Sequence, residues 1–439
     1  MSDCATVTAR RRGWWLGALF GAAFVVARVV PFLGANIGRG LDSLDYRAAA
    51  HLPVFSREFL GGPRPFGYPL YLKAVAHNEH VAVAGQLVLD TAAWLVLAVM
   101  AARATRDRRL AGAAIVVVLG VGAAFDPIQW DRIISSEALS TAFGVGLLAA
   151  LLWLRERWTA PRLAVVGVLA LLATIVRDSN GSFFGVVAVV LAIGVLVRRV
   201  PVRVLGLSAV LLAVAVTGSV SASLGRRWEG PVKDVITIRL FESPERLASL
   251  YHSGLPLSPA QVVAVRGNCV SPTLGFPCKH LVDPAFYEWI HVHGRPAYVH
   301  VLLKTPATTA WEPLAHIRDS VGTRVETEHG TGSREHAPVA KVFDAVFFVR
   351  NPTLLVVWAA LVLAGSVLVL ARRRRLGIAA IAAGLVALTY PHLWLIWVGG
   401  ALEVSRHSLL ASIQLRLGLW LGTVWLIVAL LAARESQAV

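Results

Sequence analysis

Two carboxylates and an arginine lie close together in the sequence, just after the first long apolar run. Asp42 and Asp45 are three residues apart, and Arg64 begins a turn, residues 64–69, that reads Arg-Pro-Phe-Gly-Tyr-Pro. A carboxylate beside apolar groups can act as a general base, and a guanidinium group binds phosphate through its planar fork. Ionisable groups near a bilayer are costly, so they usually face water or serve a function. Asp42 is therefore the candidate base, and Asp45 is its alternative.

More charged or titratable residues stand at the ends of apolar segments further along the chain. They are Glu137, Arg177, Glu403, Arg406 and His407. Each of these arginines is a candidate for binding an anionic group, and the alternative is a surface arginine that reaches for lipid headgroups. Glu137 opens an apolar run, where a favourable interaction with the helix N-terminus is the simpler interpretation. Together with Asp126 and Asp131, it can also form an acidic outer loop that binds a divalent cation.

The composition is that of an integral membrane protein. The chain has 439 residues, of which 56% are hydrophobic and 15% are charged, whereas soluble proteins carry about 25% charged residues. The net charge of +16 comes from arginines in short segments between apolar runs. This pattern is typical of cytoplasmic loops rather than of a nucleic-acid-binding surface. Basic residues 10–12 precede the first apolar run without a cleavage site, so we expect a retained first helix.

Ten apolar segments are candidates for membrane spans. They are residues 13–33, 81–102, 110–125, 134–154, 163–176, 183–197, 202–220, 352–370, 377–398 and 409–431. Basic residues fill every second connector, and acidic residues fill the alternate ones. Because basic loops stay in the cytoplasm, both termini are predicted inside and loop 34–80 outside. The sequence thus predicts an all-α polytopic membrane protein with about ten transmembrane helices, N-in and C-in.

The chain divides into three predicted parts. Residues 1–220 form an N-terminal transmembrane module with the first outer loop, residues 221–350 form an extracytoplasmic segment between spans seven and eight, and residues 351–439 form the C-terminal helices. The middle segment is predicted to be mainly helical, because a Ser or Asp precedes Pro at three helix starts and Gly follows where each helix would end. The starts are Ser243, Ser258 and Asp283, and the ends are Gly254, Gly267 and Gly294.

Two cysteines in this middle segment, Cys269 and Cys278, are close enough in sequence to close a small loop. A disulfide is expected if the segment lies outside the cytoplasm, and two free thiols are the alternative.

Taken in order, the polar motifs resemble those of the GT-C superfamily of polyprenyl-phosphate-sugar-dependent glycosyltransferases. The likeness is to the branch that includes protein O-mannosyltransferases, aminoarabinose transferases and many bacterial members. Asp42 and Tyr46 resemble the family's Asp-x-x-x-Tyr, and residues 64–69, which include Tyr68, resemble its Arg-x-x-Gly-Tyr-Pro.

The likeness continues through the rest of the membrane part. Residues 136–139 are similar to the family's Ser-Glu-x-Leu, and Arg177 ends the fifth span where the family often has an arginine. Residues 403–407 resemble its Glu-x-x-Arg-Tyr, except that His407 replaces the tyrosine. The likeness covers little of residues 221–350.

The resemblance implies an inverting glycosyltransferase in the plasma membrane with its active site outside the cytoplasm. Its expected partners are a polyprenyl-phosphate-linked sugar donor, an envelope glycan, lipid or protein acceptor, and the lipid bilayer. The expected catalytic residues are Asp42 and Asp45. The residues expected to bind the donor phosphate are Arg64, Arg177, Arg406 and His407. The residues expected to bind substrate are Tyr46, Tyr68, Glu137 and Glu403. No cofactor is certain, and a divalent cation stays an open option.

A transporter or flippase of lipid-linked or small solutes is the main alternative, and a scaffold for envelope assembly is a third. Transporters commonly show paired halves or broken helices that meet at the membrane midplane. This sequence shows no convincing internal repeat, and its candidate charges lie at span ends on one predicted side. These two observations favour chemistry at one membrane surface. The sugar, the acceptor and the polyprenol are not specified by the sequence.

Overall fold

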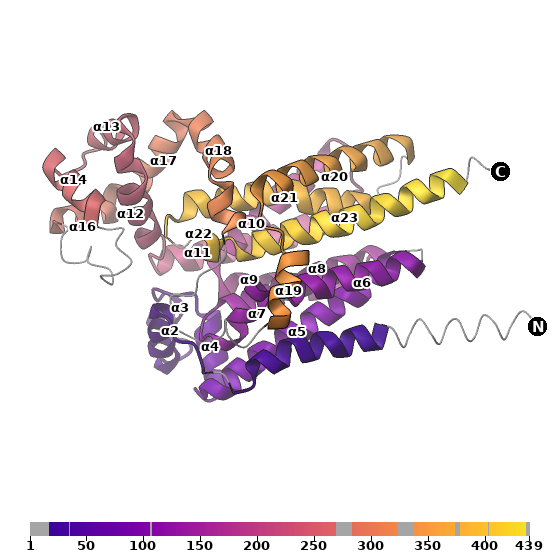
Figure 1. Cartoon of the computed structure of the whole chain (residues 1–439). Coiled ribbons are helices and arrows are strands. Elements are labelled where there is room, and N and C mark those ends of the chain that lie inside the picture. Colours follow the sequence, from indigo (N-terminus) through magenta and orange to yellow (C-terminus); the bar gives the residue numbers. More distant parts are fainter. Residues whose placement is uncertain are drawn as a thin grey trace, which may run out of the picture.

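A computed structural model describes residues 17–34, 36–105, 108–268, 283–323, 338–373, 378–402 and 404–435. Across these ranges the chain is helical, with one isolated parallel β-bridge between Gly38 and Ile133. The long helices run side by side along one axis (Figure 1). The short helices α2 (Leu41–His51), α3 (Arg57–Leu60) and α4 (Gly67–Ala74) gather at one end of this bundle.

Seven helices in the described ranges are long and apolar enough to cross a membrane. They are α5 (Glu79–Ala104), α8 (Glu137–Glu156), α10 (Asp178–Leu196), α11 (Val204–Leu224), α20 (Pro352–Arg373), α21 (Ile378–Gly399) and α23 (Leu409–Glu435). An eighth crossing is formed if two helices bent by 49°, Leu110–Gly122 and Phe125–Arg132, count as one span. Two further apolar helices are shorter, namely Gly17–Phe32 and α9 (Ala160–Val176).

The predicted all-α architecture is confirmed, and a helix occupies each of the ten predicted ranges. The helices at the first, third and fifth ranges fall short of a straight span of about 20 residues. The third is interrupted between α6 (Arg108–Gly122) and α7 (Phe125–Gln129), where Ala124 is extended. Pro127 follows in the first turn of α7, where a missing N–H is tolerated. The count of ten and the N-in, C-in orientation stay predictions.

The three helix starts predicted in the middle segment are confirmed. The helices are α13 (Pro244–His252), α14 (Pro259–Asn268) and α16 (Pro284–Trp289). At the start of α14, Ser258 Oγ accepts from the N–H of Gln261 at 3.3 Å, and Gln261 Oε1 accepts from the N–H of Ser258 at 2.8 Å. Each of these contacts satisfies a donor that the first helical turn leaves without a partner.

The predicted helix end at Gly294 is wrong. After a wide π-type turn at Ile290–Gly294, the chain continues directly as α17 (Arg295–Lys304). Pro296 lacks the N–H that an ordinary α-helical turn would use at this point, and a widened turn accommodates it. Glycine was therefore a misleading stop signal here.

The middle segment has an apolar core of its own and also contacts the bundle. Its other helices are α12 (Glu229–Ile238), α18 (Pro306–Ala315) and α19 (Pro338–Phe347). Phe286 and Trp289 of α16 pack with residues of α12 and α17 in this core. The phenol of Tyr298 donates to the carbonyl of Val398 at 2.6 Å, which joins α17 to the end of α21.

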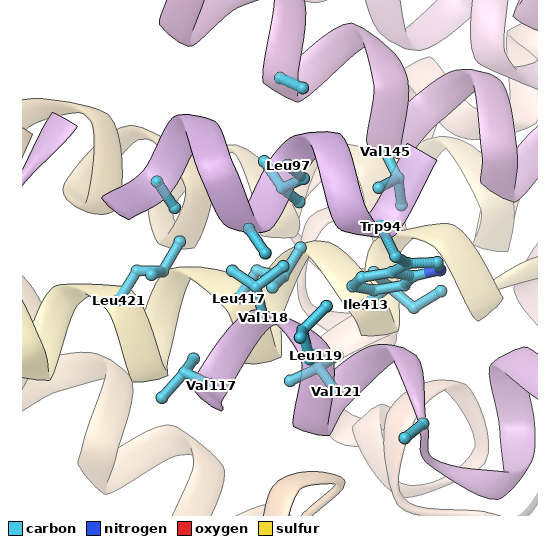
Figure 2. Close-up of a cluster of buried hydrophobic side chains, with 14 of the residues drawn as sticks. Trp94, Leu97, Val117, Val118, Leu119, Val121, Val145, Ile413, Leu417 and Leu421 are labelled. Carbon is cyan, nitrogen blue, oxygen red and sulfur yellow. The ribbon is translucent and has the colours of Figure 1, made fainter. Parts of the chain in front are cut away.

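Among the described residues, the largest hydrophobic cluster unites the N-terminal and C-terminal membrane helices (Figure 2). Trp94 and Leu97 of α5 pack with Val118 of α6 and with Ile413 and Leu417 of α23. All these side chains are almost completely buried. The first and last parts of the chain therefore form one bundle, and α23 is held beside helices that precede it by some 300 residues.

We expect Leu97→Ala to destabilise the protein by about 2–5 kcal/mol, because it leaves a cavity in this cluster. Leu89→Ala is the matched control, since Leu89 lies on the exposed side of the same helix. Thermal unfolding of the purified protein in detergent measures both. An equal loss of stability in the two variants would show that Leu97 does not lie in a packed core.

Candidate active site

Two contacts fix the start of α2, and with it Asp42. Ser43 Oγ accepts from the N–H of Gly40 at 2.7 Å and donates to the carbonyl of Ile134 at 2.6 Å. One turn further along the helix, the buried phenol of Tyr46 donates to Ser136 Oγ at 3.0 Å. Both contacts tie α2 to the segment that leads into α8. They place Asp42, in the first turn of α2, beside the N-terminus of that helix.

The Arg64 turn is positioned by a close helix contact. A Cβ on Gly67 would lie 2.7 Å from the backbone carbonyl carbon of Ile175, near the end of α9, so only glycine fits without a shift. The next residue, Tyr68, is fully buried, and its phenol donates to Gln86 Oε1 at 2.5 Å. The Gly-Tyr pair thus holds α4 against α9 and α5. This places Arg64, just before α4, next to Asp42 and Asp45 of α2.

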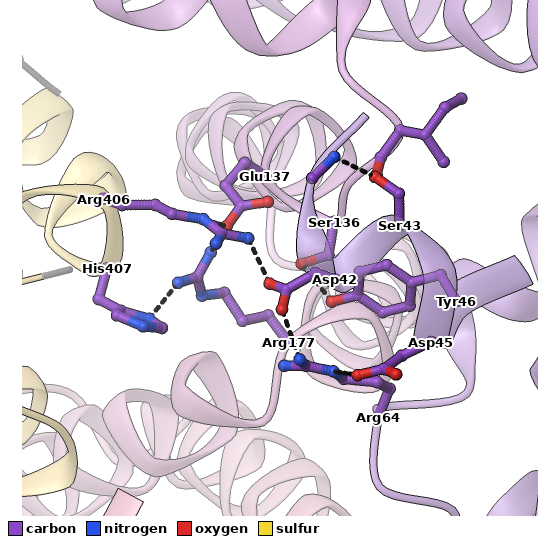
Figure 3. A network of polar contacts seen from close by, with 12 residues as sticks. Asp42, Ser43, Asp45, Tyr46, Arg64, Ser136, Glu137, Arg177, Arg406 and His407 are labelled. Atoms are coloured by element: carbon purple, nitrogen blue, oxygen red, sulfur yellow. Dashed lines mark hydrogen bonds and ion pairs between the residues drawn. The ribbon is translucent and has the colours of Figure 1, made fainter. Parts of the chain in front are cut away.

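Three carboxylates and three guanidinium groups alternate in one continuous chain of ion pairs (Figure 3). In order they are Asp45, Arg64, Asp42, Arg406, Glu137 and Arg177. Their residues come from α2, the Arg64 turn, α8, the α9–α10 junction and α22 (Val404–His407). The structure therefore brings together six predicted site residues that are spread over most of the sequence.

Asp42 lies between two arginines. Its Oδ1 accepts from Nη2 of Arg64, and its Oδ2 accepts from Nη2 of Arg406 at 2.6 Å. Asp45 contacts Nε of Arg64 at 3.0 Å. The Asp42 side chain is 19% exposed and the Asp45 side chain is 49% exposed. Asp42 is thus the more enclosed of the two carboxylates.

Glu137 is the buried centre of the network, with a side chain that is 1% exposed. Its Oε1 accepts from Nη1 of Arg177 at 2.9 Å and from Nε of Arg406 at 2.5 Å. The Arg406 guanidinium also lies over the ring of Trp130, 5.3 Å from its centroid. A buried carboxylate requires such partners, because isolated burial of its charge costs several kcal/mol. Glu137 therefore orients both arginines.

His407 extends the network by contacting Nη2 of Arg177 through its Nδ1. Enclosure among protein atoms, together with the charges of Arg177 and Arg406, lowers the pKa of His407 to about 3. The imidazole is therefore neutral at pH 7. The residue is nevertheless exposed to solvent, so it lies at the surface of the network and not at its buried centre.

The two tyrosines expected to bind substrate are both buried. Burial, and then the charges of Glu137 and Asp42, raises the pKa of Tyr46 to about 12. Burial likewise raises the pKa of Tyr68. Both phenols are therefore protonated donors near pH 7. In this structure their rings pack edge to face, with centroids 4.8 Å apart. This contact joins α2 to α4.

The expected acidic loop does not form one cation site. Asp126 pairs with Nη1 of Arg350 at 2.9 Å, and Asp131 pairs with Arg28, whereas Glu137 belongs to the network around Asp42. Each carboxylate is buried and pairs with a different arginine or group of arginines. Within the described ranges, no group of three His, Cys, Asp or Glu side chains is placed to hold a metal ion.

A second buried polar cluster was not anticipated from the sequence. Arg28 contacts both Asp90 and Asp131 through its Nη2, and its Nη1 donates to the carbonyl of Gly122 at 2.7 Å. Nearby, Gln86 Nε2 donates to the carbonyl of Ile133 at 3.0 Å. The signal was present, since Arg28 and Asp90 are charges within apolar runs. The cluster fixes the short helix η2 (Trp130–Arg132), which carries the ring under Arg406.

Three predicted residues lie outside the described residues. They are Glu403, Cys269 and Cys278. Their assignments as a substrate-binding residue and as a disulfide stay predictions.

No protein-family model matches this chain, and no curated protein matches it. The geometry of the charged network and the GT-C-like motifs are therefore the basis for a functional proposal.

We expect Gly67→Ala to destabilise the protein by about 1–3 kcal/mol, because its Cβ would press on the α9 backbone. Gly230→Ala in α12 is the control, since nothing lies within 4 Å of a Cβ there. Melting temperatures of the two variants in the same detergent test this. Tolerance of alanine at position 67 would contradict the close α4–α9 contact.

We expect Arg406→Gln to cost about 3 kcal/mol or more, because it removes one of the two cations that compensate buried Glu137. Arg39→Gln serves for comparison, because Arg39 forms an exposed ion pair with Glu79, which should contribute no more than about 1 kcal/mol. Urea or thermal unfolding measures the difference. Similar stabilities for both variants would argue against a structural role for the Arg406–Glu137 pair.

Proposed function

We propose that this protein is an integral membrane glycosyltransferase that moves a sugar from a polyprenyl-phosphate donor to a hydroxyl group of a cell-envelope acceptor. The observation that carries the proposal is the position of Asp42 between Arg64 and Arg406. A carboxylate and two guanidinium groups at one point supply both a proton acceptor and a phosphate-binding fork. The resemblance to GT-C enzymes, on motifs that contain these same residues, supports the same conclusion.

The reaction is a single displacement with inversion at the sugar. The acceptor oxygen forms a bond to the anomeric carbon, and the bond between that carbon and the phosphate oxygen breaks. The electron pair of the broken bond goes to the lipid phosphate, and the hydroxyl proton goes to Asp42. Arg64 and Arg406 bind the phosphate, whose negative charge grows in the transition state, and preorganised cations at that point lower the barrier.

The other network residues have supporting roles in this proposal. Glu137 holds Arg406 and Arg177 in place. Arg177 and His407 extend the surface available to the donor phosphate. Asp45 is the alternative base, although it contacts only Arg64 among the described residues of the network.

The proposed location of this site is the extracytoplasmic face of the plasma membrane. The network lies at the same end of the bundle as α2, α3 and α4 (Figure 1). The first described helix begins, and α23 ends, at the opposite end. α5 starts just after α4, and the basic residue Arg103 stands in its last turn. This arrangement agrees with the positive-inside rule.

A transporter or flippase is the second candidate, and one observation favours it. Arg28 and Asp90 are completely buried in apolar helices, and ionisable groups at such positions often mark a solute or proton pathway. Proteoliposomes loaded with a polyprenyl-phosphate sugar distinguish the two functions, because a flippase moves the intact lipid whereas a transferase releases lipid phosphate.

We expect Asp42→Asn to lower the rate of sugar transfer at least about 100-fold, the contribution of a general base. Asp45→Asn, which changes the same charge on the same helix, should retain most of the activity. Release of lipid phosphate from a panel of polyprenyl-phosphate sugars measures the rate, with monodisperse behaviour in detergent as the folding check. Full activity of Asp42→Asn would exclude this residue as the base.

A further inference from the structure

We infer that Asp42 and the donor phosphate compete for the same two guanidinium groups, so that binding of the phosphate releases the base that the reaction needs. This inference rests on the proposed function and adds a regulatory step at the same site. In this view the donor phosphate replaces Asp42 at the two arginines, and the arginines do not bind both groups at once.

The first observation is that both oxygens of Asp42 are occupied. Oδ1 accepts from Arg64 and Oδ2 accepts from Arg406. An acceptor hydroxyl that approaches Asp42 therefore meets oxygens that already bind N–H donors. Carboxylates and phosphates bind guanidinium groups in the same planar, charge-assisted geometry, so each can replace the other.

The second observation is that the two arginines use equivalent atoms in the same way. Arg64 binds Asp45 through Nε, and Arg406 binds Glu137 through Nε at 2.5 Å. Both arginines then direct Nη2 toward Asp42 (Figure 3). If Asp42 leaves, each guanidinium group is still held by its other carboxylate. The two Nη2 groups then remain as a preorganised pair of donors for one phosphate.

The third observation is that Asp42 can leave without unfolding α2. The start of this helix is fixed by Ser43, and its next turn is fixed by Tyr46. The Asp42 side chain is partly exposed, whereas Glu137, which anchors Arg406, is buried. Rotation about the Asp42 side-chain bonds is therefore less costly than displacement of Glu137.

The charges of the reaction agree with this exchange. Cleavage of the sugar–phosphate bond adds one negative charge to the lipid phosphate, and uptake of the acceptor proton removes one from Asp42. The total charge beside Arg64 and Arg406 is unchanged. In this exchange the arginines bind Asp42 before the donor arrives, the donor phosphodiester once it is bound, and a phosphate monoester after the transfer.

The test is the affinity of purified full-length protein for farnesyl phosphate in detergent micelles, measured by titration calorimetry. Farnesol, which lacks the phosphate, and inorganic phosphate, which lacks the lipid, are the comparison ligands. We expect Asp42→Asn to bind farnesyl phosphate about tenfold more tightly than the wild type, which corresponds to about 1.4 kcal/mol. Asp42→Ala should change the affinity in the same direction if the asparagine variant folds poorly.

Matched controls separate exchange from simple charge repulsion. Asp45→Asn removes the same unit of charge from α2 but keeps Asp42, the carboxylate that competes for both Nη2 groups, so its affinity should rise much less. Arg39→Gln changes an exposed arginine outside the network and should leave the affinity unchanged. Equal gains from Asp42→Asn and Asp45→Asn would overturn the exchange and leave only electrostatic repulsion.

The outcomes distinguish the two proposals. If the wild type binds farnesyl phosphate but not farnesol, and Asp42→Asn binds it equally or more weakly, the exchange is wrong and the glycosyltransferase proposal stands. If the wild type binds neither ligand and releases no lipid phosphate, both proposals fail. If inorganic phosphate binds as well as farnesyl phosphate and also gains from Asp42→Asn, exchange is supported, but the ligand is free phosphate rather than a lipid headgroup.

Discussion

Burial of the Glu137 carboxylate is the constraint on which the rest of the site depends. A charge at the buried N-terminus of α8 is tolerated only with cationic partners, and Arg177 and Arg406 supply them from distant segments. Arg406 then has its Nη2 directed toward Asp42. One buried acid thus fixes the α9–α10 junction, α22 and the first turn of α2 relative to one another. The arrangement of the proposed catalytic groups is a consequence of this compensation.

The sequence was sufficient to place many of the site residues on one side of the predicted bundle. Asp42, Glu137 and Arg406 stand at the ends of apolar runs, and span ends can be read from hydropathy and connector charge. It could not predict which acid pairs with which arginine. Such pairs depend on helix packing, and in the Gly67 contact the decisive distance is between backbones far apart in sequence.

Other features were missed or misplaced for identifiable reasons. Arg28 and Asp90 are single charges within long apolar runs, so the mean hydropathy of a window around each one stays high. Their pairing with each other depends on helix packing and is not visible in the sequence. Gly294 was predicted to end a helix, but the chain passes through a π-type turn at Ile290–Gly294 and continues as α17, in which Pro296 lies in the first turn. The option of a cation at the acidic loop is not supported in the described residues, because Asp126 and Asp131 are each paired with a different arginine, and such long-range pairs cannot be read from the sequence.

The ion pair between Asp42 and Arg406 joins residues 364 positions apart. During synthesis, α2 and α8 are complete long before α22 emerges from the ribosome. Until then Asp42 and Glu137 lack their contacts with Arg406. Membrane insertion of the early helices therefore proceeds with an unfinished charge pattern. The network is complete only when α22 docks against α2 and α8, so assembly of the site depends on a contact between segments that are synthesised far apart in time.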